Sequence, residues 1–216
     1  MGSMEDRGVL LVHWLQNLPY EKIGKVYADL MNDPSITDKD LAYIAKHDRY
    51  FLLTVVFGRT DALHPWLYDR CREVERDPDG HLDLWARAHY KSTIITYAGA
   101  IQEILKDPNI TIAIFAHVRN IAKAFLAQIK RELEGNEFLK RLFPEILYAE
   151  PRREAPVWSL DAGLIVKRTS NPKEGTIEAH GLVDGQPTSR HFKLRIYDDT
   201  VSREAVTTGE QIQKTL

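Results

Sequence analysis

The feature that most constrains the fold of this sequence is a short run of β-branched and apolar residues from Ile110 to Ala116. Such a run, without regular polar alternation, is typical of a strand that is buried on both faces of a parallel sheet. Helical periodicity precedes it over 92–105 and follows it over 118–133, where Ile121, Phe125 and Ile129 share one stripe. A doubly buried strand between two amphipathic helices indicates an α/β fold.

The rest of the chain divides near residue 81. Before it, apolar residues at helical spacing predict helices over 7–60 and 66–76, although the run 51–57 is compatible with either a helix or a strand. After it, apolar segments predict further strands at 82–85, 158–166, 176–179 and 191–197. We therefore expect an N-terminal helical segment over 5–62 and an α/β domain with a largely parallel sheet over 63–216. Residues 1–4, Met-Gly-Ser-Met, are typical of a cloning remnant.

The composition excludes several classes of protein. The 216 residues carry a net charge of -2, so no global positive field indicates nucleic-acid binding. The single cysteine, Cys71, rules out a disulfide framework and fits a reducing compartment. No apolar run reaches the roughly 18 residues that a membrane span requires. These features indicate a soluble intracellular domain.

The first chemical signal is the segment Arg87-Ala88-His89-Tyr90-Lys91-Ser92-Thr93, which lies between the predicted strand 82–85 and the predicted helix. A nucleotide triphosphate site needs backbone N–H groups, a cation and a hydroxyl at a helix N-terminus. Lys91 would contact the β- and γ-phosphates, Ser92 would hold magnesium, and Arg87 would add a second positive charge. The standard P-loop has glycine where Trp85 and Tyr90 stand, and Lys-Ser-Thr alone also describes an ordinary helix start.

The second signal is Asp198-Asp199 at the end of the predicted strand 191–197. In parallel α/β sheets, ligands bind at the carboxyl ends of the strands. The first carboxylate of such a pair orients magnesium, and the second polarises the attacking water as a general base. Asp199 is equally compatible with a turn or a helix cap.

Together the two signals predict a P-loop NTPase of the ASCE type, the class that carries an added catalytic strand. The interval between Lys91 and Asp198 leaves room for at least two strand–helix steps. This spacing suits such ATPases better than small-molecule kinases.

At this point the sequence resembles the large terminase subunits of tailed bacteriophages, over roughly residues 63–216. The likeness rests on segments in a shared order, which are Leu63-His64-Pro65-Trp66, Pro78-Asp79-Gly80, the loop 87–93, Asp107-Pro108-Asn109, the region 138–145, and the acidic strand followed by Glu204 and Glu210-Gln211. The family commonly has glycine where Ala88 and Tyr90 stand, and many members have glutamate where Asp199 stands.

The resemblance implies an ATPase motor that hydrolyses Mg²⁺-ATP and translocates double-stranded DNA into a procapsid. It implies three partners, which are the portal protein, the small terminase subunit and further copies of the chain in a homo-oligomeric ring, expected to be a pentamer. The expected location is the host cytoplasm and, transiently, the portal vertex of the procapsid. No membrane association is expected.

The resemblance also assigns roles to single residues. Arg87, Ala88, His89, Tyr90, Lys91, Ser92 and Thr93 would bind phosphates, with Ser92 and Asp198 at the metal and Asp199 as the base. Glu204 is the alternative base, and Arg190 is the candidate for an arginine supplied to a neighbouring subunit. His64 and Trp66 would line the adenine pocket.

The sequence contains no acidic metal cluster downstream of the motor, so nuclease activity is expected only from a further C-terminal domain. It also ends before the coupling strand that normally follows the acidic one, which predicts an exposed sheet edge. Two other functions remain open. One is a nucleotide-binding or assembly module without hydrolysis, and the other is a helicase-like ATPase outside packaging.

Overall fold

The computed structural model describes residues 4–200 except 78–79, 81, 87 and 186. The elements follow in the order α1 (Met4–Gln16), α2 (Tyr20–Asn32), α3 (Asp38–His47), α4 (Arg49–Phe51), η1 (Leu52–Val56), η2 (Thr60–Ala62), α5 (Pro65–Arg76), η3 (Thr93–Gly99), α6 (Ala100–Lys106), β1 (Ile112–Ala116), α7 (Arg119–Gly135), α8 (Glu137–Leu142), α9 (Pro151–Glu154), β2 (Trp158–Ser159), β3 (Gly163–Leu164), β4 (Ile177–Gly181) and β5 (Leu194–Tyr197). The segments η1 and η3 are π-helical, and η2 is a 3-10 turn.

The strands form one mixed sheet in the order β2-β3-β4-β1-β5. The central strand β1 is parallel to β4 and to β5, so that Ile114 lies opposite Ala179 on one side and Ile196 on the other. All residues of β1 are buried, which confirms the expectation of a doubly buried strand within 110–116. The expectation of parallel pairing holds only for β4, β1 and β5, because β2 and β3 pair antiparallel. The P-loop class itself stays a prediction.

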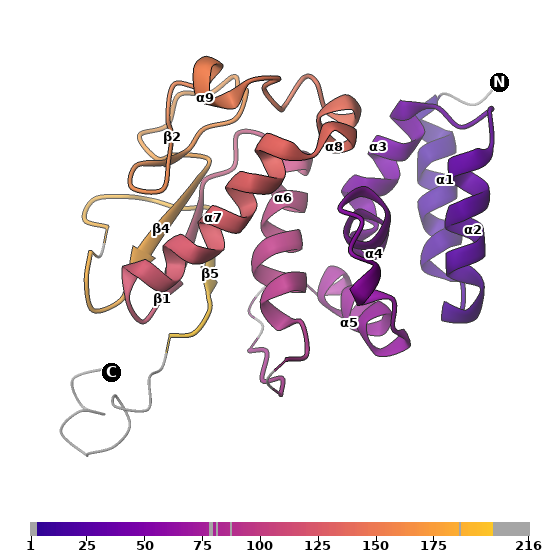
Figure 1. Cartoon of the computed structure of the whole chain (residues 1–216), viewed down its shortest axis with the longest axis horizontal. Coiled ribbons are helices and arrows are strands. Elements are labelled where there is room, and N and C mark those ends of the chain that lie inside the picture. The colour runs from indigo at the N-terminus through magenta and orange to yellow at the C-terminus, as the bar shows by residue number, and fades with distance from the viewer. Residues whose placement is uncertain (1–3, 78–79, 81, 87, 186, 201–216) are drawn as a thin grey trace.

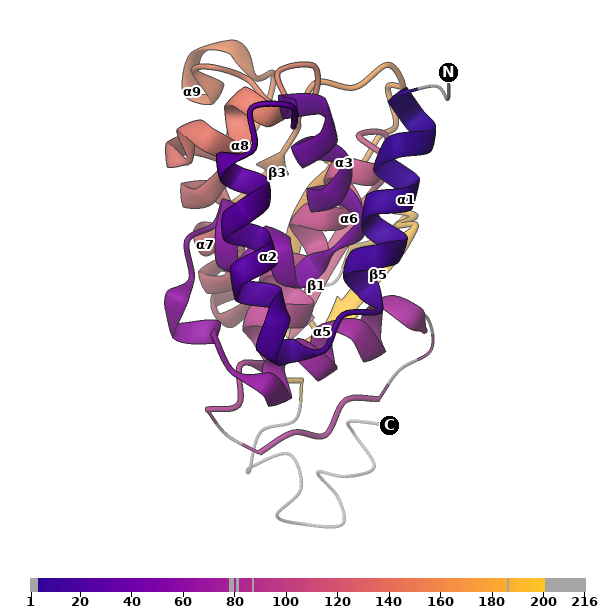
Figure 2. The same cartoon turned by 90° about the vertical axis from the view of Figure 1, so that its right-hand side faces the viewer.

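The helices lie on one side of the sheet. Helix α7 lies across the sheet and packs directly on β1 and β4, and α6 lies between this part and the N-terminal helices (Figure 1). The opposite face carries a second, smaller apolar cluster formed by Ala113, Phe115 and Phe192. Seen from the side, helices α1 to α3 stand in front of α6 and the sheet (Figure 2). None of the described helices is long and apolar enough to cross a lipid bilayer.

The N-terminal helices share a hydrophobic core with the α/β part. Leu15 of α1 and Ile44 of α3 are fully buried in the same cluster as Ile104 of α6. The third helix, α3, begins with a capping box between Thr37 and Asp40. The ambiguous run 51–57 is helical, because it continues α4 into η1.

A buried polar network also joins these parts. Asp48 is fully buried, accepts a hydrogen bond from Tyr27 Oη at 2.8 Å, and forms an ion pair with Arg72 of α5 at 2.9 Å. Glu75 accepts a hydrogen bond from Gln102 of α6 at 2.8 Å, and burial raises its pKa. Removing one partner from such a network leaves a buried charge uncompensated. The network therefore fixes how α2, α5 and α6 lie against one another.

The strand predicted over 82–85 is wrong. Residues 82–86 form no regular structure, and the side chains of Leu82 and Leu84 are 81% and 84% exposed. A strand is stable only when neighbouring strands satisfy its backbone groups. In the described part of the chain β5 is an edge strand that pairs with β1 alone, and Tyr197 on it is 57% exposed.

Candidate functional site

Lys91 and Asp198 are far apart in the sequence and meet in the structure. The Lys91 Nζ atom lies 3.0 Å from Asp198 Oδ1. The second carboxylate oxygen, Oδ2, accepts a hydrogen bond of 2.7 Å from Thr96 Oγ1. Asp198 follows β5 directly, and its backbone N–H donates to Phe115 O at the end of β1. The two predicted signals, the lysine loop and the acidic strand end, therefore form one site.

A helix N-terminus adds to this site. Helical structure begins at Lys91, and Ile94 N donates to Tyr90 O at 2.9 Å to close the first turn. The first N–H groups of a helix have no acceptor within it, and they carry the positive end of the helix dipole. Both views place the start of this helix and the carboxyl end of β5 at the same end of the molecule (Figures 1 and 2). The site therefore combines a cation, oriented N–H groups and a carboxylate.

Asp198 is ionised although it is buried. Its exposed fraction is 4%, and burial by itself acts to raise the pKa of the carboxyl group. Hydrogen bonds from Ser92, Thr96 and Lys91, together with the Lys91 charge, outweigh burial and hold the pKa of Asp198 below its ordinary value. Ser92 thus shares the carboxylate with Lys91, as a magnesium-binding pair of hydroxyl and carboxylate would require.

The loop before Lys91 is conformationally strained. Ala88 has φ 62° and Tyr90 has φ 61°, both in the left-handed region. Left-handed backbone costs an L-residue with a Cβ about 1–2 kcal/mol, whereas glycine adopts it freely. These are the two positions at which the resembled family commonly has glycine. In this chain the two positions have a backbone conformation that favours glycine, but they carry alanine and tyrosine.

The side chain of Tyr90 contacts Arg59 and Asp61. Tyr90 Oη donates to Asp61 Oδ2 at 2.9 Å, and the Arg59 guanidinium lies 5.9 Å from the centre of the Tyr90 ring. Arg59 also donates to both oxygens of Asp61, at 2.8 and 2.7 Å. Hydrogen bonds from Arg59 and Tyr90 lower the pKa of Asp61, which stays charged.

Sequence reasoning missed three of these residues. Thr96 follows Ser92 by one helical turn, so helical spacing could have placed it on the face of Asp198. Arg59 and Asp61 carry no such signal, because their proximity to Tyr90 arises only from the tertiary packing.

An aromatic cluster lies beside the loop. The Trp66 ring meets those of His89 and Trp85 edge-on, with centroid distances of 5.4 and 5.2 Å. His64 has a structural role, because its Nδ1 accepts a hydrogen bond from Trp66 N at the start of α5. Trp66 thus lies near the loop, and an adenine pocket lined by His64 and Trp66 stays a prediction.

Asp199 lies at the exposed carboxyl edge of the sheet. It is exposed, has φ 53°, and its backbone oxygen accepts a hydrogen bond of 3.0 Å from His117 N. The Nδ1 atom of His117 is buried and has no hydrogen-bond partner among the described residues. Arg87 and Glu204, which the sequence also predicted at this site, lie outside the residues that the structure describes.

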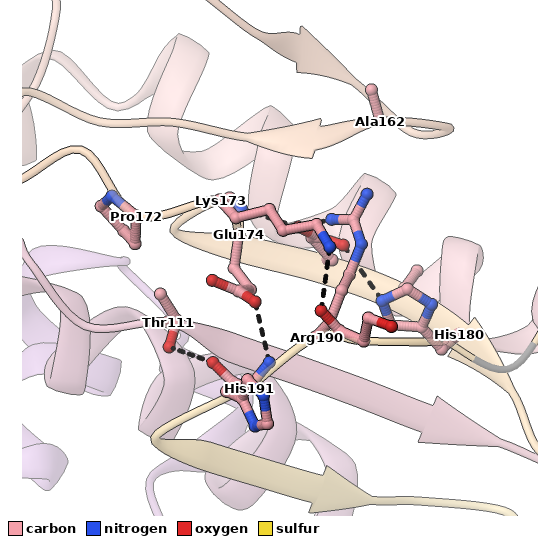
Figure 3. Close-up of polar contacts among 12 residues, drawn as sticks. Thr111, Ala162, Pro172, Lys173, Glu174, His180, Arg190 and His191 are labelled. Carbon is pink, nitrogen blue, oxygen red and sulfur yellow. Dashed lines mark hydrogen bonds and ion pairs between the residues drawn. The ribbon is translucent and has the colours of Figure 1, made fainter.

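Arg190 precedes β5 and Asp198 follows it, so the two residues lie at opposite ends of this strand. Figure 3 shows Arg190 beside His180. Its guanidinium donates to Glu178, whose second oxygen lies 3.1 Å from His180 Nε2. Burial acts to raise the pKa of Glu178, but hydrogen bonds from His180 and Gly175 N and the Arg190 charge outweigh it and lower the pKa. Within one chain Arg190 therefore compensates a buried carboxylate. Its action on a neighbouring subunit stays a prediction.

The residues at Lys91 and Asp198 fit a magnesium nucleotide. In the described residues no group of three or more His, Cys, Asp or Glu side chains is placed to hold a metal ion. Magnesium in nucleotide sites is held by one or two carboxylates and by the substrate phosphates, which is the donor set that Asp198 and Ser92 would complete. Comparison with protein-family models, curated proteins and solved structures finds no match for this chain.

The strain at Ala88 gives the first prediction. Ala88→Gly should increase the free energy of unfolding by about 1 kcal/mol, because glycine removes the cost of the left-handed conformation. Urea unfolding measures this change. The matched control is Ala155→Gly, where φ is -74°, and glycine there should lower stability by roughly 0.4–1 kcal/mol. Equal destabilisation by both changes would contradict the strained loop.

The lowered pKa of Asp198 gives the second prediction. A carboxyl group whose folded pKa lies below its ordinary value of 3.8 stabilises the fold above that value, and the contribution is lost as the pH falls through the folded pKa. The wild type should therefore exceed Asp198→Asn in free energy of unfolding at neutral pH, and the difference should shrink below pH 3.8. Urea unfolding across this pH range measures it. A difference that is independent of pH would show that the charge of Asp198 contributes nothing.

Proposed function

We propose that this chain binds and hydrolyses Mg²⁺-ATP as the motor domain of a viral genome-packaging terminase. The observation that carries the proposal is the meeting of Lys91, Ser92 and Asp198 at one helix N-terminus. A lysine, a hydroxyl and a carboxylate at such a place are the groups that phosphoryl-transfer enzymes of the P-loop class use. Because residues 63–216 resemble large terminases, we propose that the ATPase acts in DNA packaging.

Each of these side chains has its own role in the proposed hydrolysis of ATP. Lys91 leaves Asp198 and binds the β- and γ-phosphates, while the first N–H groups of the helix bind further phosphate oxygens. Ser92 and Asp198 hold magnesium, which neutralises charge that develops on the transferred phosphoryl group. Asp199, next in the chain and exposed, accepts the proton of the attacking water. Glu204 is the alternative base.

The remaining parts of the proposal concern the assembled motor. Arg190 would act on the site of a neighbouring copy, since one arginine supplied in trans raises phosphoryl-transfer rates by about 10³–10⁵. The partners would be double-stranded DNA, the portal protein, the small terminase subunit and a ring of like chains. The proposed location is the host cytoplasm and the portal vertex of the procapsid.

A second candidate is a nucleotide-binding module without hydrolysis. The strained loop favours this module, because Ala88 and Tyr90 must keep their left-handed backbone conformation when the nucleotide binds. Such a module would bind Mg²⁺-ATP through Lys91 and would show no turnover at any protein concentration.

Steady-state hydrolysis and ATP-dependent thermal shifts test the proposal together. The wild type should hydrolyse ATP at a rate that rises more steeply than its concentration, because the site is completed by a neighbouring copy. Lys91→Ala should lose the thermal shift and hydrolysis together, since the phosphate-binding cation is gone. Asp199→Asn should keep the shift and lose roughly 10²–10⁴-fold in turnover, as expected for a missing general base.

The matched control is Lys106→Ala. Lys106 lies at the opposite end of the same helix, is 33% exposed against 35% for Lys91, and is paired with Glu103. It should leave binding and turnover unchanged. If the folded wild type neither binds nor hydrolyses ATP, the proposed nucleotide site is wrong.

A further inference from the structure

We propose that Asp61 and Arg59 are positioning residues that hold the loop before Lys91 in its binding conformation through the side chain of Tyr90. This inference rests on the proposed nucleotide site and adds to it a control element outside the loop. It implies that the N-terminal helical segment sets the affinity of the site.

The contacts form a continuous path. Tyr90 Oη donates to Asp61 Oδ2 at 2.9 Å, and Asp61 is held by two hydrogen bonds from Arg59. Tyr90 immediately precedes Lys91, whose Nζ reaches Asp198 at 3.0 Å. A change at Asp61 is thus transmitted to the phosphate-binding lysine through one side chain and one peptide bond.

The N-terminal helices hold the other end of this path. Arg59 N donates to Leu53 O in η1 at 3.1 Å, and Tyr50 Oη donates to Ala62 O at 3.3 Å. Tyr50 and Leu53 are fully buried, so these anchors belong to the rigid core. The turn that carries Asp61 therefore moves with the N-terminal helices.

The backbone of Tyr90 explains why the contact matters. A hydrogen bond between a partly exposed tyrosine and an exposed carboxylate contributes little by itself. Tyr90, however, stands in the left-handed region, which a tyrosine leaves unless its surroundings hold it there. Loss of the contact with Asp61 therefore shifts the loop toward ordinary backbone conformations and moves the N–H groups and Lys91 out of place.

Two measurements on the intact chain test this inference. The variants are Tyr90→Phe, which removes only the hydroxyl group, Asp61→Ala, and the double variant. Hydrogen exchange of the amides of residues 88–91, measured without nucleotide, should be several-fold faster in each variant. The Kd for Mg²⁺-ATP should rise about tenfold in each single variant, and the double variant should resemble either one, because all three lose the same contact.

The control is Tyr68→Phe, which removes a hydroxyl group that donates to Leu18 O at 2.7 Å. It should lower the melting temperature without changing loop exchange or the Kd, which separates positioning from general stability. Unchanged loop exchange in Tyr90→Phe and Asp61→Ala, or fully additive effects on the Kd, would overturn the inference. If the wild type binds no Mg²⁺-ATP, the proposed function fails, and loop exchange alone still decides whether Asp61 positions the loop.

Discussion

The negative charge of a buried carboxylate must be balanced by hydrogen bonds or a positive charge. Asp198, directly after β5, is such a carboxylate. The compensation comes from one helix, in which Lys91, Ser92 and Thr96 all direct polar groups toward it. Their convergence fixes where the helix starts relative to the sheet. It also gathers a cation, a hydroxyl and the N–H groups of a helix start around a charge, which supports the proposed magnesium-triphosphate site.

The loop that presents Lys91 depends on distant parts of the chain. Alanine and tyrosine disfavour the left-handed backbone conformation that Ala88 and Tyr90 have in this loop. The conformation therefore persists only because surrounding contacts stabilise it. At Tyr90 the contacts come from Arg59 and Asp61, which directly follow the N-terminal helices in the chain. The shared core and the network around Asp48 make these helices a structural support for the site. The α/β part alone does not explain the conformation of the loop.

Local signals explain which parts of this structure the sequence could predict. The doubly buried strand within 110–116 is encoded by neighbouring residues, and it was predicted correctly. The segment 82–85 has the composition of a strand, but a strand needs a partner, and no local pattern reports whether one is present. The rule about strand ends placed Asp198 at the carboxyl end of β5, but the strand expected to lead into Lys91 does not form, so this rule did not predict where Lys91 lies. The contact of Asp61 with Tyr90 and that of Arg190 with Glu178 follow from packing, which the sequence does not display.

The central claim is that Lys91, Ser92 and Asp198 form one magnesium-triphosphate site. The most direct test is a crystal structure of the chain with Mg²⁺ and a non-hydrolysable ATP analogue. The account predicts that the triphosphate lies at the helix N-terminus, that Lys91 Nζ has moved from Asp198 to a phosphate oxygen, and that the metal lies beside Ser92 and Asp198. An analogue bound elsewhere, with the Lys91–Asp198 ion pair intact, would contradict the claim.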